Sequence, residues 1–429
     1  MHLRVSAISV ACLALFGCQP ETEGPDQCRD ENYALSALLS EVSAEPSYSE
    51  LDGTIRDLMR VRGLPGCSIG VVDENDIVYV KGYGNANISE ALPFEATTPS
   101  AIGSVSKTLT ALAMLKLVEL GYAALDDTVN AHLGANTVPE WESVTIHHLL
   151  SHTGGFAGDP IFEPGARLEA DFQTLYGTDL EHPGLFPAIL VPAYADLTPF
   201  DPAQVGTPQY SNAGYTVLGA VIDSIVADHP DALGAVGYED FTWRAMPQTG
   251  FTLCQNEYWR EDDIPNLAMG YDGSGEEAPA HLDGQSSSGA PTGGPAGWQG
   301  PAGGWSVTIN DLMRVLIGVN TRANMDPALW EAMMTPHATV LGAPYGYGVF
   351  LSGSGAQSSG GIRVPGEQEE PLVYFHGGSI EGYKAFYRAQ PETGRAVAAM
   401  CNSSNTGTET IVSAVEDYFW GGGPPLTLP

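Results

Sequence analysis

The chain has 429 residues, of which 43% are apolar and 9% aromatic, and this is enough to bury the core of one large domain or of two closely packed ones. It carries 17 Lys and Arg against 52 Asp and Glu, a formal charge of −35, so binding to anionic nucleic acid is electrostatically unfavourable. Composition therefore excludes a fibrous or disordered protein and argues against a nucleic-acid-binding role.

The N-terminus has the layout of a secretory signal. Arg4 precedes an apolar stretch over 5–16 that is too short to span a bilayer. The four residues that end at Cys18 resemble a bacterial lipobox, so 1–17 is interpreted as a lipoprotein signal peptide and Cys18 as the lipid anchor. Ordinary secretion, with Cys18 incidental, is the alternative. The acidic segment 18–46 suits a tether, and we expect an exported bacterial lipoprotein in the cell envelope, at the outer membrane or the periplasmic face.

The first elements along the chain are a helix and a hairpin. Residues 47–50 have capping-box spacing, and apolar residues then recur at helical intervals up to about Arg62. Beyond the Gly and Pro residues that end this helix, 67–72 and 77–81 are predicted as two strands joined by a short turn.

The middle of the chain is predicted to be mainly helical, with helices at 104–120, 144–150 and 217–226. Two segments rich in Pro, Gly and acidic residues, 157–206 and 273–304, are predicted as loops or as lids over a site.

The C-terminal part returns to strands. Three apolar segments separated by Gly or Pro turns, at 372–375, 383–389 and 395–400, indicate antiparallel strands, and 412–420 indicates a closing helix. Strands at both ends with helices between them predict one sheet assembled from the two termini, with a helical insertion, in an α+β fold.

Two motifs compete for a functional role but fit poorly. Ser68 lies in a G-x-S-x-G pattern, which in α/β-hydrolases needs a strand before the serine and a helix after it, whereas a hairpin is predicted here. His148 and His152 are spaced to contact a metal from one helix face. No acidic or Cys ligand lies nearby in sequence, so packing and capping of a helix end is the favoured interpretation, and no metal is expected.

Ser104 and Lys107 form an S-x-x-K element. Gly103 permits a tight turn into the predicted helix, and residues i and i+3 share a helix face, so the Lys107 amine can reach the Ser104 hydroxyl. At a helix N-terminus the free backbone N–H and the positive dipole end favour a neutral lysine acting as base and an amide ready to bind an oxyanion. The alternative is Ser104 as a simple N-cap with Lys107 solvated.

Such a site also needs a second proton-transfer group and a strand edge facing the serine. Y-x-N occurs twice and H-x-G four times, so each is weak alone. Only the Y-x-N motif at 210–212 and the H-x-G motif at 376–378 have the required order, in which the serine comes first, the tyrosine second and a predicted strand late in the chain third.

Together these motifs resemble the serine β-lactamase and penicillin-binding-protein superfamily, and within it the class C β-lactamase-related serine hydrolases, which include D,D-peptidases, D-aminopeptidases and family VIII esterases. The resemblance covers roughly 47–420 and follows the family's order. Beyond the three motifs it includes Leu125-Asp126-Asp127, the Leu-Leu-Ser-His-Thr-Gly-Gly run within 144–155, Asn212-Ala213-Gly214-Tyr215, Gly303-Gly304-Trp305-Ser306 and Asp311-Leu312.

The resemblance implies an antiparallel sheet built from N- and C-terminal strands, flanked by helices, with a mostly helical inserted subdomain and the active site between the two parts. The hydrolase domain would be 47–429. Its sheet part would comprise about 47–100 and 300–429, and its helical part about 101–300.

The resemblance also implies catalytic roles. Ser104 would be the nucleophile, giving an acyl-enzyme that water cleaves. Lys107 and Tyr210 would share proton transfer. Asn212 would hydrogen-bond the lysine and the substrate.

The predicted strand would supply the rest of the site. The backbone N–H groups of Ser104 and Ser379 would form the oxyanion hole, and Gly377 and Gly378 would let a substrate backbone approach closely. At His376, β-lactamases usually carry the Lys of a K-T-G element, and a histidine is a weaker clamp for a substrate carboxylate.

This departure favours ester or D-amino-acid amide and peptide hydrolysis, with weak β-lactamase activity at most. The expected partner is a small-molecule ester, amide or peptide, and no cofactor is expected. A non-catalytic penicillin-binding or sensor module of the same fold is the first alternative, and an α/β-hydrolase using Ser68 is the second. In the implied fold the first and last strands are antiparallel neighbours, so Cys67 and Cys401 are a possible disulfide, with two free thiols as the alternative.

Overall fold

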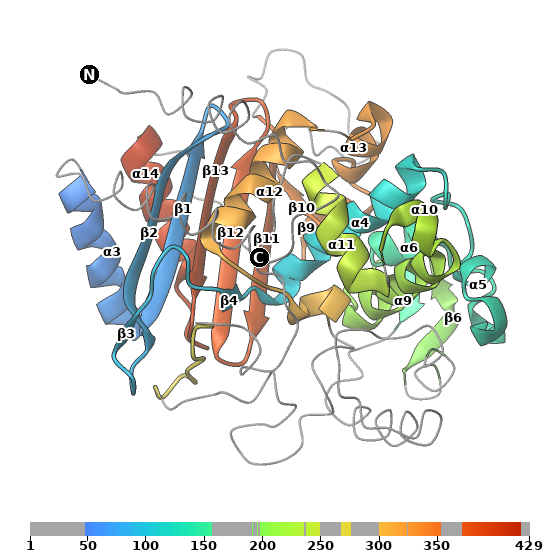
Figure 1. The fold of residues 1–429 in the computed structure, drawn as a ribbon, viewed down its shortest axis with the longest axis horizontal. Coiled ribbons are helices and arrows are strands. Elements are labelled where there is room, and N and C mark those ends of the chain that lie inside the picture. The colour runs from blue at the N-terminus through green and yellow to red at the C-terminus, as the bar shows by residue number, and fades with distance from the viewer. Residues whose placement is uncertain are drawn as a thin grey trace.

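The computed structural model describes residues 48–156, 191, 195, 198–235, 237–248, 267–275, 300–323, 325–352 and 371–421. The signal peptide and tether expected over 1–46, and most of the two expected loops, lie outside these residues. Helices cover both faces of one large antiparallel sheet in an α+β fold (Figure 1). None of the described helices is long and apolar enough to cross a membrane.

The main sheet has the strand order β3-β2-β1-β13-β12-β11-β10-β9-β8, so strands from the two ends of the chain meet near its centre. The strands are β1 (Gly66–Asp73), β2 (Asp76–Asn87), β3 (Leu92–Pro93), β4 (Ser100–Ala101), β5 (Gly154–Phe156), β6 (Phe200–Val205), β7 (Ser306–Val307), β8 (Ala338–Val340), β9 (Ala343–Tyr345), β10 (Phe350–Ser352), β11 (Val373–Ile380), β12 (Tyr383–Gln390) and β13 (Arg395–Cys401). The α-helices are α3 (Ser49–Arg62), α4 (Ser106–Glu119), α5 (Val129–His132), α6 (Ile146–Leu150), α9 (Asn212–Asp228), α10 (Pro230–Leu233), α11 (Gly237–Gln248), α12 (Ile309–Thr321), α13 (Pro327–Met333) and α14 (Thr408–Trp420).

The N-terminal helix and hairpin form as predicted, with differences at their ends. Helix α3 ends at Arg62, but its N-cap is Tyr48, which makes no side-chain cap bond, so the predicted capping box does not start this helix. Glu74 and Asn75 have φ values of 51° and 64°, the left-handed pair that a two-residue type I′ turn requires. Strand β2 continues to Asn87, beyond its predicted end.

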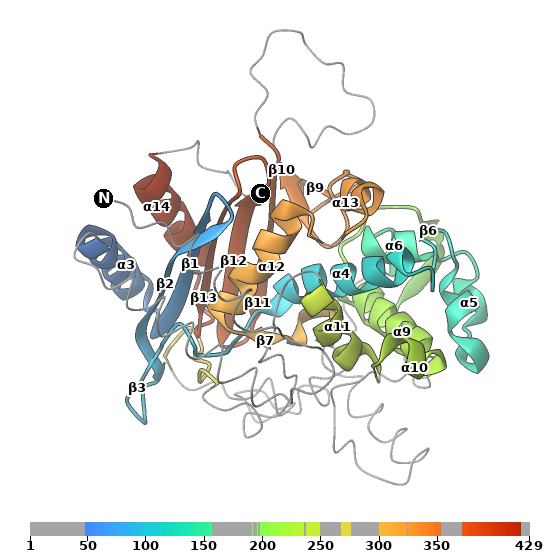
Figure 2. The same cartoon turned by 45° about the horizontal axis from the view of Figure 1, so that its top comes forward.

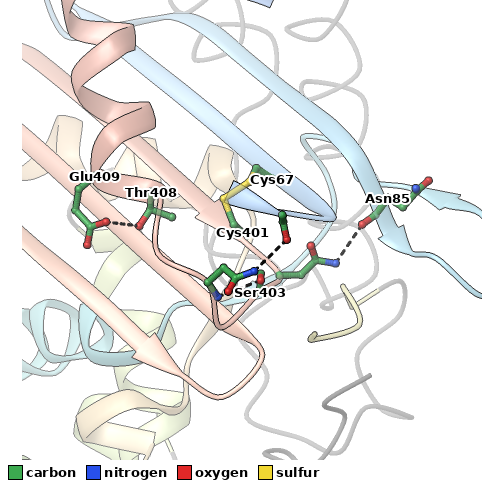
Figure 3. The surroundings of a disulfide bond; sticks show 9 residues. Cys67, Asn85, Cys401, Ser403, Thr408 and Glu409 are labelled. Atoms are coloured by element: carbon green, nitrogen blue, oxygen red, sulfur yellow. Dashed lines mark hydrogen bonds between the residues drawn. A yellow bond between two sulfur atoms is a disulfide. The ribbon is translucent and has the colours of Figure 1, made fainter. Parts of the chain in front are cut away.

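The two ends of the chain are joined in the centre of the sheet. Strand β1 pairs antiparallel with β13, with Cys67 opposite Cys401. These cysteines form a disulfide with a Cα–Cα distance of 4.1 Å (Figure 3). The disulfide considered possible from the resemblance is therefore present, and the alternative of two free thiols is wrong.

Alternate residues of β1 face opposite layers. Ile69 joins an apolar cluster with Ile55 of α3 and Val412 of α14, so these two helices cover one face. Gly70 faces α12 on the other side, where a Cβ would come 2.6 Å from Met313 Cγ. Figures 1 and 2 show α3 and α14 on one side of the sheet and α12 on the other.

Most of the described residues between β4 and β7 form a helical part beside the sheet (Figure 2). Helix α4 lies at its centre, packs against α9 and α11, and is buried along most of its length. Helix α6 begins two residues inside the predicted 144–150, and α9 begins five residues before the predicted 217–226 and ends two residues after it. The end of the expected loop 157–206 is a strand instead, because β6 pairs with β5 through Val205 and Gly154.

The three predicted C-terminal strands are β11, β12 and β13, and the predicted closing helix is α14. The main difference is that β11 continues to Ile380. The strand therefore contains the whole segment 376–379.

Candidate active site

Ser104 lies in a 3₁₀ turn, η2 (Gly103–Val105), that leads into α4. The α-helix itself begins at Ser106, so Ser104 precedes the helix that the spacing predicted it to start. Residues three apart are also eclipsed in a 3₁₀ turn, and Lys107 Nζ lies 3.1 Å from Ser104 Oγ. Gly103 has φ +52°, a left-handed conformation that glycine adopts without steric cost.

Lys107 is fully buried, and its amine is surrounded by oxygen acceptors. It donates to Asn212 Oδ1 at 2.6 Å and to the backbone oxygen of Ala302 at 2.6 Å. A buried amine needs such partners, because an unpaired one pays the full cost of desolvation. The side chain is thereby held in one position beside Ser104.

Ala302 was missed by the sequence analysis. It lies in a π-helical turn, η8 (Gly300–Gly304), at the end of the segment predicted as a loop. Its contribution is a backbone oxygen, and no side-chain motif marks such a group. The neighbouring glycines were the only sequence signal that the backbone approaches the site closely.

Tyr210, Ser211 and Asn212 form the entry to α9. Ser211 is the N-cap, and its hydroxyl accepts a hydrogen bond from the Gly214 N–H at 3.1 Å, as is typical of serine at this position. Asn212 is thus the first helical residue, with its amide oxygen on Lys107 Nζ. The Tyr210 ring centroid lies 5.0 Å from Lys107 Nζ, so the structure brings Tyr210 and Asn212 together at the lysine.

Strand β11 lies against the turn that carries Ser104. A Cβ on Gly378 would come 1.8 Å from Ile102 O and 3.2 Å from Ser104 N, and a Cβ on Gly103 would come 2.6 Å from Ser379 N. The backbones of the turn and the strand therefore touch, with the amide groups of Ser104 and Ser379 close together. Gly378 makes this contact possible because it lacks a side chain. The sequence analysis had expected it to let a substrate backbone approach instead.

Among the described residues, one edge of β11 has no strand partner beside the serine. Strand β10 pairs with β11 only as far as Phe375, and from His376 to Ile380 the described residues pair β11 only with β12. Gly377 has room for a side chain, because a Cβ there meets only Phe386 Cδ2, at 3.5 Å.

His376 is buried and neutral. Its Nδ1–H donates to Gly377 O at 2.7 Å and its Nε2 accepts from the Tyr345 hydroxyl at 3.3 Å. Burial is the main cause that lowers the pKa of His376 to about 3, and Lys107 adds to this effect while its amine is protonated. The histidine therefore presents no positive charge to a substrate carboxylate at neutral pH.

The two competing motifs do not form sites. Ser68 is fully buried in the middle of β1, which a hairpin follows, so there is no nucleophile elbow. His148 caps α6 through Thr145, which agrees with the favoured interpretation that these histidines pack and cap a helix end. His152 lies in the following turn and contacts Ser211. Within the described residues no group of His, Cys, Asp and Glu side chains is arranged to hold a metal ion.

Known proteins resemble this chain in sequence. The family model described as Beta-lactamase matches residues 51–415. Protein flp of Staphylococcus aureus (strain COL) is 28% identical over 188 residues, which are 42% of this chain and 34% of that protein. The mitochondrial serine beta-lactamase-like protein LACTB of Mus musculus is 33% identical over 147 residues, 32% of this chain and 26% of that protein. The matches thus span about a third or less of these relatives' length.

Solved structures extend the likeness to most of the chain. The octameric penicillin-binding protein homologue from Pyrococcus abyssi superposes with a TM-score of 0.64 at 27% identity, over 89% of this chain and 79% of that one. A class C beta-lactamase gives 0.64 at 18% identity, over 88% and 97% of the two chains. The D-alanine carboxypeptidase AmpC from Burkholderia cenocepacia gives 0.58 at 18% identity, over 86% and 98%, and the last two show the fold alone. Because the family model spans most of the sequence, the chain belongs to the Beta-lactamase family, whose fold is that of the serine beta-lactamases and penicillin-binding proteins.

Proposed function

We propose that the protein is an exported serine hydrolase that cleaves ester bonds, or amide and peptide bonds of D-amino acids, through an acyl-enzyme. Ser104 Oγ attacks the substrate carbonyl carbon and passes its proton to a neutral Lys107. Tyr210 shares in delivering a proton to the leaving group. Water then cleaves the acyl-enzyme and regenerates the serine.

The developing oxyanion needs donors that are in place before the reaction. The backbone N–H groups of Ser104 and Ser379 have this role in the proposal, supported by the close contact of their two backbones. Asn212 holds Lys107 through its amide oxygen, and in the proposal it also hydrogen-bonds the substrate.

The observation that carries the proposal is the position of Lys107. A buried amine 3.1 Å from Ser104 Oγ is within the reach that a general base needs. A solvated lysine beside an N-cap serine, the alternative considered for this motif, is excluded by that burial.

The substrate class follows from the charge of the site. The neutral His376 offers no strong clamp for the carboxylate of a β-lactam, so weak β-lactamase activity at most is expected. Neutral esters and D-amino-acid amides have no such requirement.

Hydrolysis of a nitrophenyl ester by the wild type, Ser104→Ala and Ser68→Ala tests the proposal. We expect a burst of nitrophenol in the wild type and in Ser68→Ala, and its loss in Ser104→Ala, because only Ser104 forms the acyl-enzyme. Ser68→Ala is the matched control, since it removes a serine hydroxyl remote from the site. Activity that survives in Ser104→Ala would refute the assignment, and cephalosporin turnover far above ester turnover would refute the substrate class.

A protein that acylates once and never turns over would be the sensor of the first alternative. The same burst experiment distinguishes it, because a sensor releases one equivalent of nitrophenol and then stops. Continued release after the burst identifies an enzyme.

Export by lipidation of Cys18 is the second part of the proposal. We expect the chain expressed in a Gram-negative host to incorporate labelled palmitate and to fractionate with the membranes, and Cys18→Ser to do neither. Release of both forms in soluble form into the periplasm would leave ordinary secretion as the explanation.

A further inference from the structure

His152 is a buried residue that the proposed chemistry does not use. It is 2% exposed and lies in the turn after α6 with φ +58°, a conformation that is uncommon for residues other than glycine. Its ring is enclosed by aromatic rings, with centroids at 4.3 Å to Tyr210, 4.7 Å to Tyr345 and 5.0 Å to Tyr215.

His152 holds the chain on both sides of Tyr210. Its Nδ1 accepts a hydrogen bond from the Ser211 N–H at 3.1 Å, and its backbone oxygen accepts one from the Gln209 N–H at 2.8 Å. The residue before and the residue after the tyrosine are thus fixed to one histidine.

The hydrogen bond from Ser211 defines which nitrogen of the His152 ring carries the proton. Because Nδ1 accepts from a backbone N–H, the neutral ring carries its proton on Nε2. Within the described residues Nε2 has no hydrogen-bond partner although it is fully buried. The hydrogen bond from Ser211 therefore fixes the orientation of the ring and its tautomer.

We infer that His152 is a positioning residue for the hydrolysis: it sets the segment 209–212, and so places Tyr210 and Asn212 relative to Lys107 and Ser104. The inference rests on the proposed function. His152 touches neither Ser104 nor the acyl group in this role. It acts through the backbone of the residues that do.

Three variants separate the acceptor from the backbone conformation. Asn tolerates a left-handed φ, and its Oδ1 takes about the place of the histidine Nδ1, so His152→Asn keeps both features. His152→Gly keeps the conformation and loses the acceptor. His148→Ala is the matched control, because it removes a histidine four residues earlier that does not contact the segment 209–212.

We expect His152→Gly to lower kcat for the nitrophenyl ester by about 10²-fold, the scale of one misplaced proton-transfer group, with KM nearly unchanged. His152→Asn restores most of this loss, and His148→Ala keeps the wild-type kcat. A His152→Gly variant with wild-type kcat, or a His152→Asn variant as slow as His152→Gly, would overturn the inference.

Amide hydrogen exchange supplies a readout that does not depend on turnover. In peptides covering 209–212, exchange is expected to be slow in the wild type and in His152→Asn and fast in His152→Gly, while α4 stays equally protected in all three. Unchanged protection of 209–212 in His152→Gly overturns the inference whether or not the protein is active. If the wild type hydrolyses nothing while the exchange pattern is as expected, the proposed function fails and the positioning of the segment stands.

Discussion

Single side chains in this protein owe their chemistry to burial. The two histidines His147 and His376 have lowered pKa values for the same first reason, which is that the charged imidazolium loses its hydration. The sequence shows that a histidine is present but not how deeply it lies. The sequence predicted that His376 is a weaker carboxylate clamp than a lysine, and burial makes the imidazole neutral at neutral pH.

Burial of His147 makes the stability of the protein depend on pH. Its Nδ1 lies 2.7 Å from the Tyr347 hydroxyl, and burial with the nearby His337 and His148 lowers its pKa from 6.5 to about 4. Between these values the unfolded chain binds more protons than the folded one, so the stabilisation is complete above about pH 6.5 and is lost as the pH falls toward about 4.

Urea unfolding of the wild type and His147→Gln at about pH 7 and about pH 5 measures this effect. Gln cannot be protonated in this range, so the variant is expected to lose less free energy of unfolding on acidification. The upper limit of the difference is about 1.4 kcal/mol per pH unit, and it is smaller because the side chain is partly exposed. Equal losses in both proteins would contradict the assignment.

At the scale of elements, the site is made where a turn and a strand meet. The turn before α4 carries Ser104, and β11 carries Ser379, and the two approach so closely that neither Gly103 nor Gly378 has room for a Cβ. The amide donors are therefore set by the packing of the two elements. No flexible side chain is involved.

This contact predicts opposite outcomes for two adjacent glycines. Gly378→Ala places a Cβ about where Ile102 O now lies, 1.8 Å away, so β11 and the turn must separate. A misplacement of about 1 Å at a reacting group costs on the order of 10²-fold in rate, and we expect kcat for the nitrophenyl ester to fall by at least that much.

Gly377→Ala is the matched control. Its Cβ meets only the Phe386 ring, at an ordinary 3.5 Å, so β11 and the turn keep their contact and the variant is expected to fold. A small nitrophenyl ester has no peptide backbone to lie along β11, so kcat for it is expected to stay near that of the wild type. Equal losses in the two variants, or none in Gly378→Ala, would show that the contact does not set the oxyanion donors.

At the scale of the whole molecule, the sheet joins the N-terminal and C-terminal parts of the chain. Its first and last long strands are paired at the centre, and the disulfide joins two residues that are 334 positions apart. Disulfides persist in oxidising compartments, which agrees with the proposed export.

Replacement of both Cys67 and Cys401 by Ala is expected to lower the free energy of unfolding by about 2–5 kcal/mol, the range for removal of a native disulfide. Urea unfolding with and without reductant measures it. Reductant should shift the midpoint of the wild type to that of the double variant and leave the double variant unchanged. A wild-type midpoint that reductant does not move would show that the bond contributes no stability.

Much of the fold was predictable from local patterns. The turn at 73–76, the strand segments and the C-terminal ends of α3 and α14 follow from residue periodicity and from Gly and Pro, because these act on neighbouring residues. Helix α14 begins at Thr408, four residues before its predicted start. The predictions differed where packing decides an element's extent. Strand β11 runs on to Ile380 because β12 pairs with it, and β6 forms because β5 lies beside it.

The sequence by itself determined the order of the motifs and the three-residue spacing of Ser104 and Lys107, because one helical turn makes such neighbours meet. Only the tertiary structure decided which oxygens surround the lysine, how deeply His376 is buried, and that His152 binds the segment around Tyr210. Those contacts join residues far apart in the chain. Their geometry depends on how the helical part packs against the sheet, which no local spacing encodes.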